Sequence, residues 1–285
     1  FSNNELGGAF RNYGFQGKAH GINAGIMQPI YRGRTLTLTS DLSFDILNAR
    51  TKMVGQTFQK YDLRVLRAGL NGVKDDNRGR WVSRLEVSTG SPIMGGSSDV
   101  WLIGDRVSGA GIGTGKFVKI GANLMRVQYL PKDRTGIVKV STQYSPMALL
   151  PVEQMQFGGM SSVRGFDEAL LLGDIGYTLS LEARKPVPFI PASISIPYWF
   201  NKSVKVPLKN RIHAAAFYDQ GLGYSLHQPA GFTHRNFLQA VGVGLRCYLT
   251  KYMSANFDLG IPLGRDRIAG QDRVKFHFSL TSDVF

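Results

Sequence analysis

Residues Ile175 to Pro186 read IGYTLSLEARKP, and their side chains separate into an apolar and a polar face. The apolar face carries Ile175, Tyr177, Leu179, Leu181 and Ala183, and the polar face carries Gly176, Thr178, Ser180, Glu182 and Arg184. Successive side chains of a β-strand point to opposite faces of a sheet. The alternation therefore predicts a strand with one face in an apolar medium and the other in water.

The same period-two pattern recurs along the whole chain, in segments of roughly ten residues. Strands are expected at Ala19–Ile30, Thr35–Ile46, Gln59–Asn71, Trp81–Thr89, Phe117–Leu130, Gly136–Pro146, Ile175–Pro186, Arg211–Asp219, Phe237–Tyr248, Tyr252–Ile261 and Arg273–Val284. Part of a twelfth strand is expected within Glu5–Gln16, and no segment has a helical pattern. The fold class is therefore all-β.

The composition favours a membrane barrel over a soluble β-sandwich. Hydrophobic residues make up 43% of the chain and charged residues only 19%, yet no apolar run reaches the roughly 18 residues of a transmembrane helix. The polar faces hold mostly Ser, Thr, Gly and Asn, as the wall of a wet lumen would. Aromatic residues near strand ends resemble interfacial girdles; they are Tyr61, Trp81, Tyr129, Tyr177, Tyr218, Tyr248 and Tyr252. We expect an antiparallel transmembrane β-barrel.

The connections alternate between short and long, as in bacterial outer-membrane barrels with short periplasmic turns and longer extracellular loops. Long connections are expected at Leu47–Phe58, Gly90–Lys116, Met147–Asp174, Gln220–Asn236 and Pro262–Asp272. One segment breaks this rule. Val187–Asn210 is long and rich in proline, although it falls on the side of the short turns, and the sequence offers no physical account of it.

Within the third long connection, residues 161–168 read SSVRGFDE and place a charged Arg164 between Val163 and Phe166. An arginine so placed, just before a membrane-type strand, suggests a loop that folds into the pore. This motif resembles the outer-membrane-protein-85 superfamily, and within it the TpsB translocators of two-partner secretion. Those proteins carry Val-Arg-Gly-Phe or Val-Arg-Gly-Tyr at the tip of their sixth extracellular loop.

Two further elements of the TpsB pattern follow in the expected order. The family has an acidic residue in the next strand, where this chain has Glu182, and a Phe-x-Asp-x-Gly motif in the strand after it. That motif is Phe217, Asp219 and Gly221 here, and Val163 to Phe166 form the loop tip. The resemblance covers essentially all of the chain.

The resemblance also implies a larger barrel than this chain provides. The family barrel has sixteen strands, with the sixth loop between the eleventh and the twelfth, and five strands follow Arg164 here as required. Only six strands and part of a seventh precede it. We therefore expect residues 1–285 to be a single barrel domain of eleven or twelve strands, with the N-terminal strands and the periplasmic POTRA domains missing. Residues 147–174 are expected to fold inward.

An inward loop would place Arg164 in a partly desolvated lumen, where an unpaired guanidinium is costly. Asp219 shares a face with His213 and Phe217, opposite Ile212, Ala214 and Tyr218. If the latter face meets lipid, Asp219 points into the lumen, and Glu182 does so by the same alternation. We predict an Arg164–Asp219 ion pair, because the planar guanidinium can hold a carboxylate at two points. Glu182 should lie nearby as a second acceptor, and Gly165 should permit the tight backbone at the tip.

The function that the resemblance implies is export of a large secreted protein, in extended form, through a barrel in the outer membrane of a Gram-negative bacterium. The implied partners are that client, outer-membrane lipids and lipopolysaccharide, and the barrel-assembly machinery. The final Phe285 matches the C-terminal aromatic signal that this machinery recognises, although it lies out of phase with the last strand. A barrel-insertion factor of the same superfamily and a passive diffusion porin remain alternatives.

An enzyme is not expected. The five histidines show no metal-ligand spacing, and neither a nucleophile elbow nor a phosphate-binding loop occurs in the sequence. No cofactor or metal is predicted. The net charge of +14 leaves a soluble nucleic-acid binder as a distant alternative. The basic residues, however, are scattered singly along alternating strands, so no nucleic-acid partner is expected.

Overall fold

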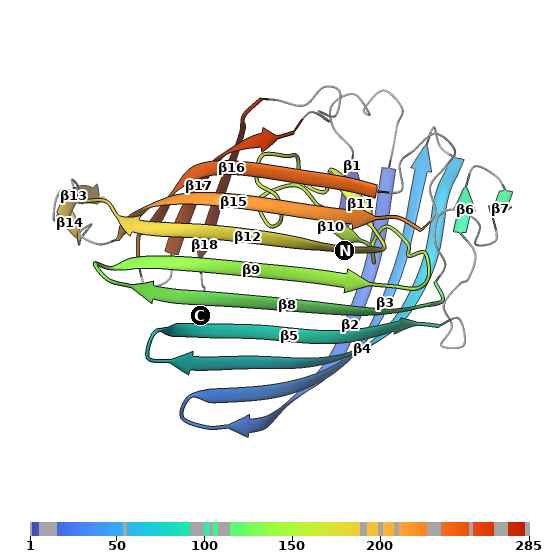
Figure 1. Cartoon of the computed structure of the whole chain (residues 1–285). Helices are drawn as coiled ribbons and strands as arrows, with labels where there is room; N and C mark the ends of the chain where they lie inside the picture. The colour runs from blue at the N-terminus through green and yellow to red at the C-terminus, as the bar shows by residue number, and fades with distance from the viewer. Residues whose placement is uncertain are drawn as a thin grey trace.

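A computed structural model describes residues 2–5, 16–53, 56–91, 100–102, 105–107, 115–188, 193–198, 202–207, 211–226, 235–250, 253–264 and 273–282. Twelve strands follow one another in a single curved sheet (Figure 1). They are β1 (Ser2–Glu5), β2 (Gln16–Arg32), β3 (Leu36–Met53), β4 (Gln56–Asp76), β5 (Gly79–Gly90), β8 (Phe117–Leu130), β9 (Arg134–Tyr144), β12 (Ile175–Pro186), β15 (Ile212–Tyr224), β16 (Arg235–Tyr248), β17 (Met253–Leu263) and β18 (Lys275–Ser282).

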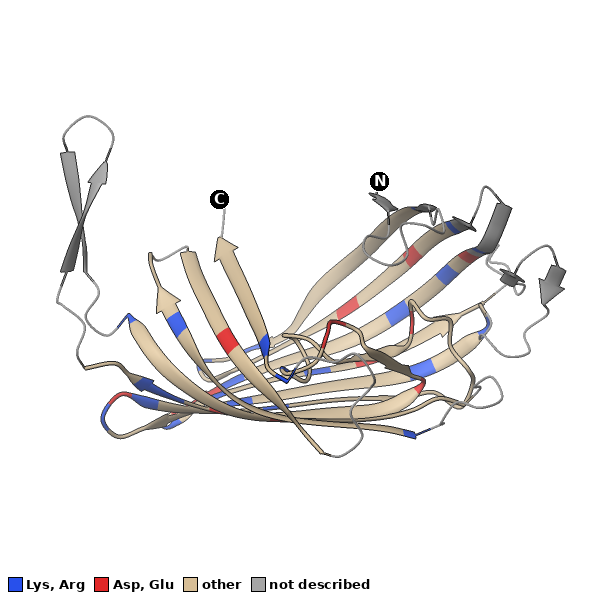
Figure 2. Ribbon diagram, turned by 90° about the horizontal axis from the view of Figure 1, so that it is seen from above, with Lys and Arg blue, Asp and Glu red and all other residues tan. Residues whose placement is uncertain are grey.

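Each of these strands pairs antiparallel with the next along the chain, which makes the sheet a continuous meander. Short strands decorate three connections: β6 (Val100–Leu102) with β7 (Asp105–Val107), β10 (Met155–Phe157) with β11 (Leu171–Gly173), and β13 (Ser193–Tyr198) with β14 (Lys202–Pro207). In the described part of the chain no pairing joins β18 to β1, so the sheet is an open trough (Figure 2). No helix among the described residues is long and apolar enough to cross a membrane.

The eleven strands expected from the sequence are all present, most of them within a few residues of their expected bounds, whereas β3, β4 and β15 extend five to seven residues beyond their predicted ends. The expected twelfth is present only in part. Strand β1 pairs with β2 through Ser2↔Ala19 to Glu5↔Gln16, so it overlaps the predicted segment at Glu5 alone. Residues 6–15 of that segment lie outside the described part.

One predicted loop is wrong. The connection expected at Leu47–Phe58 is instead a continuation of β3 and β4, which pair from Leu36↔Lys74 to Met53↔Gln56. The pairs Asn48↔Asp62 and Arg50↔Lys60 are polar, although they continue the outward face of β3 that carries Leu42, Phe44 and Ile46, so the apolar alternation ends there. Backbone hydrogen bonds do not need an apolar face, and the ladder continues beyond the point where the sequence pattern stops.

The segment Val187–Asn210, for which the sequence offers no account, contains the hairpin β13–β14, which pairs from Ser193↔Pro207 to Tyr198↔Lys202. It projects from the end of the sheet where the other turns are short (Figure 1). We refer to this as the turn end of the sheet, and to the end that carries residues 145–174 as the loop end.

The two faces of the sheet have opposite chemistry. The convex face exposes large apolar side chains, so that Leu181 is 40% and Leu245 44% exposed. Their neighbours on the concave face are charged yet buried, with Glu182 at 9% and Arg246 at 3%. Apolar side chains outside and buried charges inside are the reverse of a soluble protein and are the arrangement of a transmembrane barrel.

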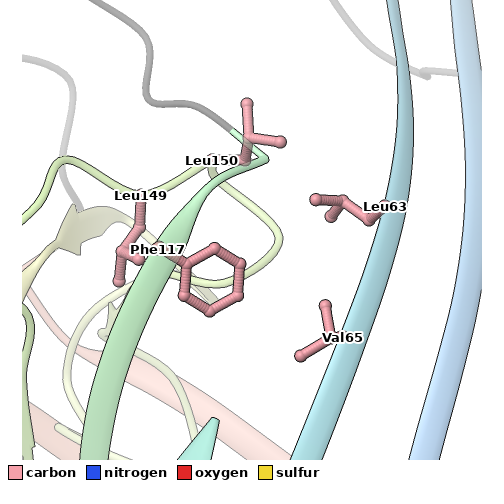
Figure 3. Close-up of a cluster of buried hydrophobic side chains, with 5 residues drawn as sticks. All are labelled: Leu63, Val65, Phe117, Leu149 and Leu150. Atoms are coloured by element: carbon pink, nitrogen blue, oxygen red, sulfur yellow. The ribbon is translucent and has the colours of Figure 1, made fainter. Parts of the chain in front are cut away.

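The connection between β9 and β12, residues 145–174, packs on the concave face through two apolar clusters. In the first, Leu149 and Leu150 pack with Leu63 and Val65 of β4 and with Phe117 of β8 (Figure 3). In the second, Phe157, Val163 and Phe166 pack with Leu238 and Ala240 of β16. These contacts hold the connection, hereafter the inner loop, against the wall at two places. We call the part with Leu149 and Leu150 its first limb, and the part with Phe157, Val163 and Phe166 its second limb.

Candidate functional site

Arg164 lies at the tip of the inner loop and is only 6% exposed. Its Nε donates to Asp219 Oδ2 at 2.7 Å and its Nη2 donates to Asp219 Oδ1 at 2.9 Å. The backbone N–H of Arg164 also donates to Asp219 Oδ2, at 3.0 Å. This is the two-point contact expected from the sequence, strengthened because both partners are charged.

Asp219 stands on β15 and is fully buried. It faces the lumen because the alternation along β15 places it opposite the outward Ala214 and Ala216. The carboxylate therefore comes from the sheet and the guanidinium from the loop, so that the ion pair fixes one to the other.

Glu182 on β12 is the second acceptor, as the sequence predicts, and it also anchors a wider cluster. Arg164 Nη1 donates to its Oε2. Arg246 of β16 binds both of its oxygens, at 3.0 and 2.9 Å, and Arg184 donates to Oε1 at 2.6 Å. Asp258 of β17 completes the group by accepting from Arg246 Nη2 at 2.8 Å.

The cluster thus contains three guanidinium groups and three carboxylates from four strands and the loop. Each of these buried charges has an opposite charge within hydrogen-bond distance, which offsets the desolvation cost of burying it. We call this set the tip cluster: Arg164, Glu182, Arg184, Asp219, Arg246 and Asp258.

Phe217 and Gly221 shape the seat in which the tip lies. The Arg164 Cζ atom lies 3.6 Å from the centroid of the Phe217 ring, a cation–π contact on the side of the guanidinium that carboxylates do not occupy. A Cβ at Gly221 would lie 3.0 Å from Phe157 and from Val163. Gly221 therefore leaves the space that the loop fills, and each member of the Phe-x-Asp-x-Gly motif has a distinct contact with the loop.

Gly165 has a φ of 133°, in the region that side chains rarely adopt. A Cβ there would lie 2.9 Å from Ala240 Cβ. On the other side, a Cβ at Gly260 of β17 would lie 2.4 Å from the Arg164 carbonyl oxygen. The backbone of the tip therefore lies directly on the wall, while Val163 and Phe166 beside it are buried at 0% and 3% exposure.

The electrostatic environment keeps Arg164 charged. Burial alone would lower the pKa of its guanidinium, but the hydrogen bond and charge of Asp219 and those of Glu182 raise this pKa above its ordinary value. The guanidinium at the tip therefore carries a permanent positive charge.

A second polar anchor, which the sequence reasoning missed, holds the first limb of the inner loop. Glu153 is 4% exposed. Its carboxylate accepts from Arg67 of β4 at 2.6 and 3.1 Å and pairs with Lys119 Nζ of β8 at 2.8 Å. The alternation does place Arg67 and Lys119 on inward faces, but nothing in the sequence indicates which loop carboxylate would reach them.

Asp174, also missed, ties the base of the inner loop together. It is fully buried and accepts from the backbone N–H groups of Leu149 at 2.8 Å and Leu226 at 2.7 Å. Gln154 Nε2 donates to the same carboxylate at 3.0 Å. Beyond the tip, Asp167 pairs with Lys275 of β18. Phe285, the expected C-terminal signal, lies outside the described residues.

Among the described residues no group of His, Cys, Asp and Glu side chains has the arrangement of a metal site. The acidic side chains of the tip cluster are instead neutralised by arginines. Such a site can hold a loop in place against the polar inner face of the sheet.

A family model described as haemolysin secretion/activation protein ShlB/FhaC/HecB matches residues 2–200. The chain belongs to this family. The ShlB/FhaC/HecB proteins are TpsB translocators, and membership places the chain in the bacterial outer membrane.

Among curated proteins, the chain is similar to the heme/hemopexin transporter protein HuxB of Haemophilus influenzae. The two sequences are 25% identical over 97% of the chain and 46% of HuxB. The chain thus spans about half the length of the curated relatives it matches.

Solved structures with the same fold include CdiB from Escherichia coli, with a TM-score of 0.73 and 19% identity over 94% of the chain and 46% of CdiB. BamA from Haemophilus ducreyi lacking POTRA domains 1-3 follows at a TM-score of 0.59 and 12% identity, over 94% of the chain and 55% of that BamA. At these identities the likeness shows the fold alone, an antiparallel β-barrel, and nothing about the client.

Proposed function

We propose that this chain forms the wall and the inner loop of a TpsB translocator that exports a secreted partner protein through the barrel lumen. The observation that carries the proposal is the tip cluster. It joins a loop to the inner wall by buried, fully neutralised charges, in a chain that belongs to a family of secretion proteins.

The two polar anchors of the inner loop, the tip cluster and the Glu153 ion pairs, differ in the solvent exposure of their basic side chains, and this difference suggests different roles. In the tip cluster the side chains of Arg164, Asp219 and Arg246 are exposed by 7%, 0% and 4%, and Arg184 at the edge of the cluster is exposed by 21%. At the other anchor, Arg67 and Lys119 are exposed by 21% and 13%. Water can replace the partners of the more exposed pair at lower cost. The tip acts as a permanent brace, and the limb that carries Glu153 is the part that yields to a client.

The chemistry of transport needs no reaction centre. A client in extended form passes along the polar concave face, which offers hydroxyl, amide and charged groups to its backbone. The net charge of +14 favours an acidic client and the phosphates of lipopolysaccharide at the loop end. The assembly machinery that inserts barrels into the membrane is a further partner in this proposal, with Phe285 as its signal.

The experiment is a secretion assay with the full-length protein and its client in an outer membrane. Arg164→Ala should abolish export while a heat-modifiable barrel is still assembled. Arg235→Ala, which removes an exposed arginine on the outward face of β16, serves as the control and should leave export unchanged. A passive porin would instead show steady conductance that is unaffected by Arg164→Ala. Export at the wild-type level from the Arg164 variant would contradict the proposal.

A further inference from the structure

The convex face of the sheet is hollowed near its turn end. The hollow has a volume of about 1160 Å³. Its floor consists of small outward side chains on neighbouring strands, Ala183 of β12 with Ala214 and Ala216 of β15, and its sides are Leu130, Leu245 and Phe276.

Cross-strand register explains the hollow. Ala183 pairs with Gly136 on one side and with Ala216 on the other, so three adjacent outward positions lack a large side chain. The next pair toward the loop end is Leu181↔Tyr218, where the wall regains its thickness. A strip of small side chains flanked by large ones forms a groove that can bind an apolar chain.

Two cations stand at the turn-end rim of this hollow. Arg184 pairs with Thr135, which brings Lys185 and Arg134 next in register on neighbouring strands, with both side chains outward and exposed. Both line the hollow. Like charges in adjacent cross-strand positions repel each other, and within the described part of the chain neither has an acidic partner. An anion between them would relieve the repulsion.

We infer that this hollow binds one anionic phospholipid, with its phosphate between Arg134 and Lys185 and an acyl chain over the three alanines. The turn end of an outer-membrane barrel faces the periplasm, and Trp81 marks the interface at this end because it is outward and 39% exposed. In the periplasmic leaflet a lipid has its headgroup toward the periplasm and its acyl chains toward the membrane centre. The two cations and the apolar floor of the hollow follow one another in the same direction. The inference is independent of the proposed export.

The experiment uses the full-length protein, purified in detergent, stripped of lipid and studied by native mass spectrometry. Phosphatidylglycerol should be retained as a single bound molecule, and phosphatidylcholine with the same chains should bind at least about fivefold more weakly, since an interfacial cation adds on the order of 1 kcal/mol toward an anionic lipid. Arg134→Gln with Lys185→Gln should remove this preference.

A second variant fills the floor, because Ala216→Trp faces lipid and leaves the rim charges in place. This variant should weaken the binding of phosphatidylglycerol and of phosphatidylcholine to a similar degree. Heat modifiability on gels should show that its barrel is folded. Lys74→Gln, which removes an outward cation near the same end but away from the hollow, should change nothing. The inference is overturned if the wild type does not distinguish the two lipids, if the Gln pair keeps the preference, or if the hollow mediates a protein dimer that Ala216→Trp dissociates.

Discussion

At the scale of the residue, Arg164 shows how a single charge orders a loop. It makes three hydrogen bonds to Asp219, one to Glu182 and one to Ser180, while Phe217 covers its face. Removing one partner of a buried ion pair costs more than removing both, because the remaining charge is left desolvated.

The Arg164–Asp219 pair should therefore show strong coupling. Arg164→Ala should destabilise the folded barrel by about 3–5 kcal/mol, and adding Asp219→Asn should restore part of that loss. Thermal unfolding in detergent measures the free energies of the single and double variants. Additive losses from the two changes would show that the contact does not matter to the fold.

Two glycines with positive φ separate backbone strain from loop seating. Gly165→Ala introduces strain and a Cβ only 2.9 Å from Ala240, whereas Gly264→Ala, at φ 109°, introduces strain with no atom within 4 Å. Each variant should lose about 1–3 kcal/mol of unfolding free energy because of backbone strain. Only Gly165→Ala should also displace the tip of the inner loop from the wall. Protease cleavage after Arg164 is the readout, and equal cleavage in the two variants would contradict the seating.

At the scale of the element, several strands are longer than the alternating sequence pattern that predicts them. Strand β4 has 21 residues, or roughly 70 Å at about 3.3 Å per residue, against an apolar band of about 25 Å. The sequence predicts the part of β3 and β4 inside that band. It does not predict residues 47–53 of β3 and 56–58 of β4, because the outward positions turn polar at Asn48 and Arg50 and the backbone ladder has no sequence signature of its own.

The site divides in the same way. Arg164, Asp219 and Glu182 could be predicted because a charge in an apolar context and strand parity both point to the lumen. Glu153 and Asp174 could not, since a carboxylate in a polar loop looks the same whether it is exposed or buried. Only the path of the inner loop brings Glu153 to Arg67 and Asp174 to Leu149.

The limb anchor can be tested against an acidic neighbour in the same loop. Glu153→Gln removes the charge that pairs with Arg67 and Lys119, whereas Glu168→Gln removes a charge whose side chain is 64% exposed. The first variant should raise channel conductance in planar bilayers several-fold, because the limb leaves the wall, and the second should not. Unchanged conductance in Glu153→Gln would show that apolar packing of Leu149 and Leu150 alone holds the limb.

At the scale of the whole molecule, the sheet separates two solvents. Its convex face presents leucine, valine and phenylalanine to lipid, and its concave face carries charges in two networks, one around Glu182 and one around Arg67 and Arg84. A hollow of about 180 Å³ on the concave side includes Asn123, Ser141 and Thr142 among its lining residues. This is the surface over which an exported chain would pass.

Neighbouring residues on β8 test this account most directly. Asn123 lines the concave hollow, whereas Leu124 is 45% exposed and points outward. A photoreactive amino acid is placed at either position in the full-length protein, and the client is stalled during export by a folded domain at its C-terminus. Crosslinks to the client from position 123, and none from position 124, are predicted. Crosslinks from both positions alike, or from neither, would contradict export through the lumen.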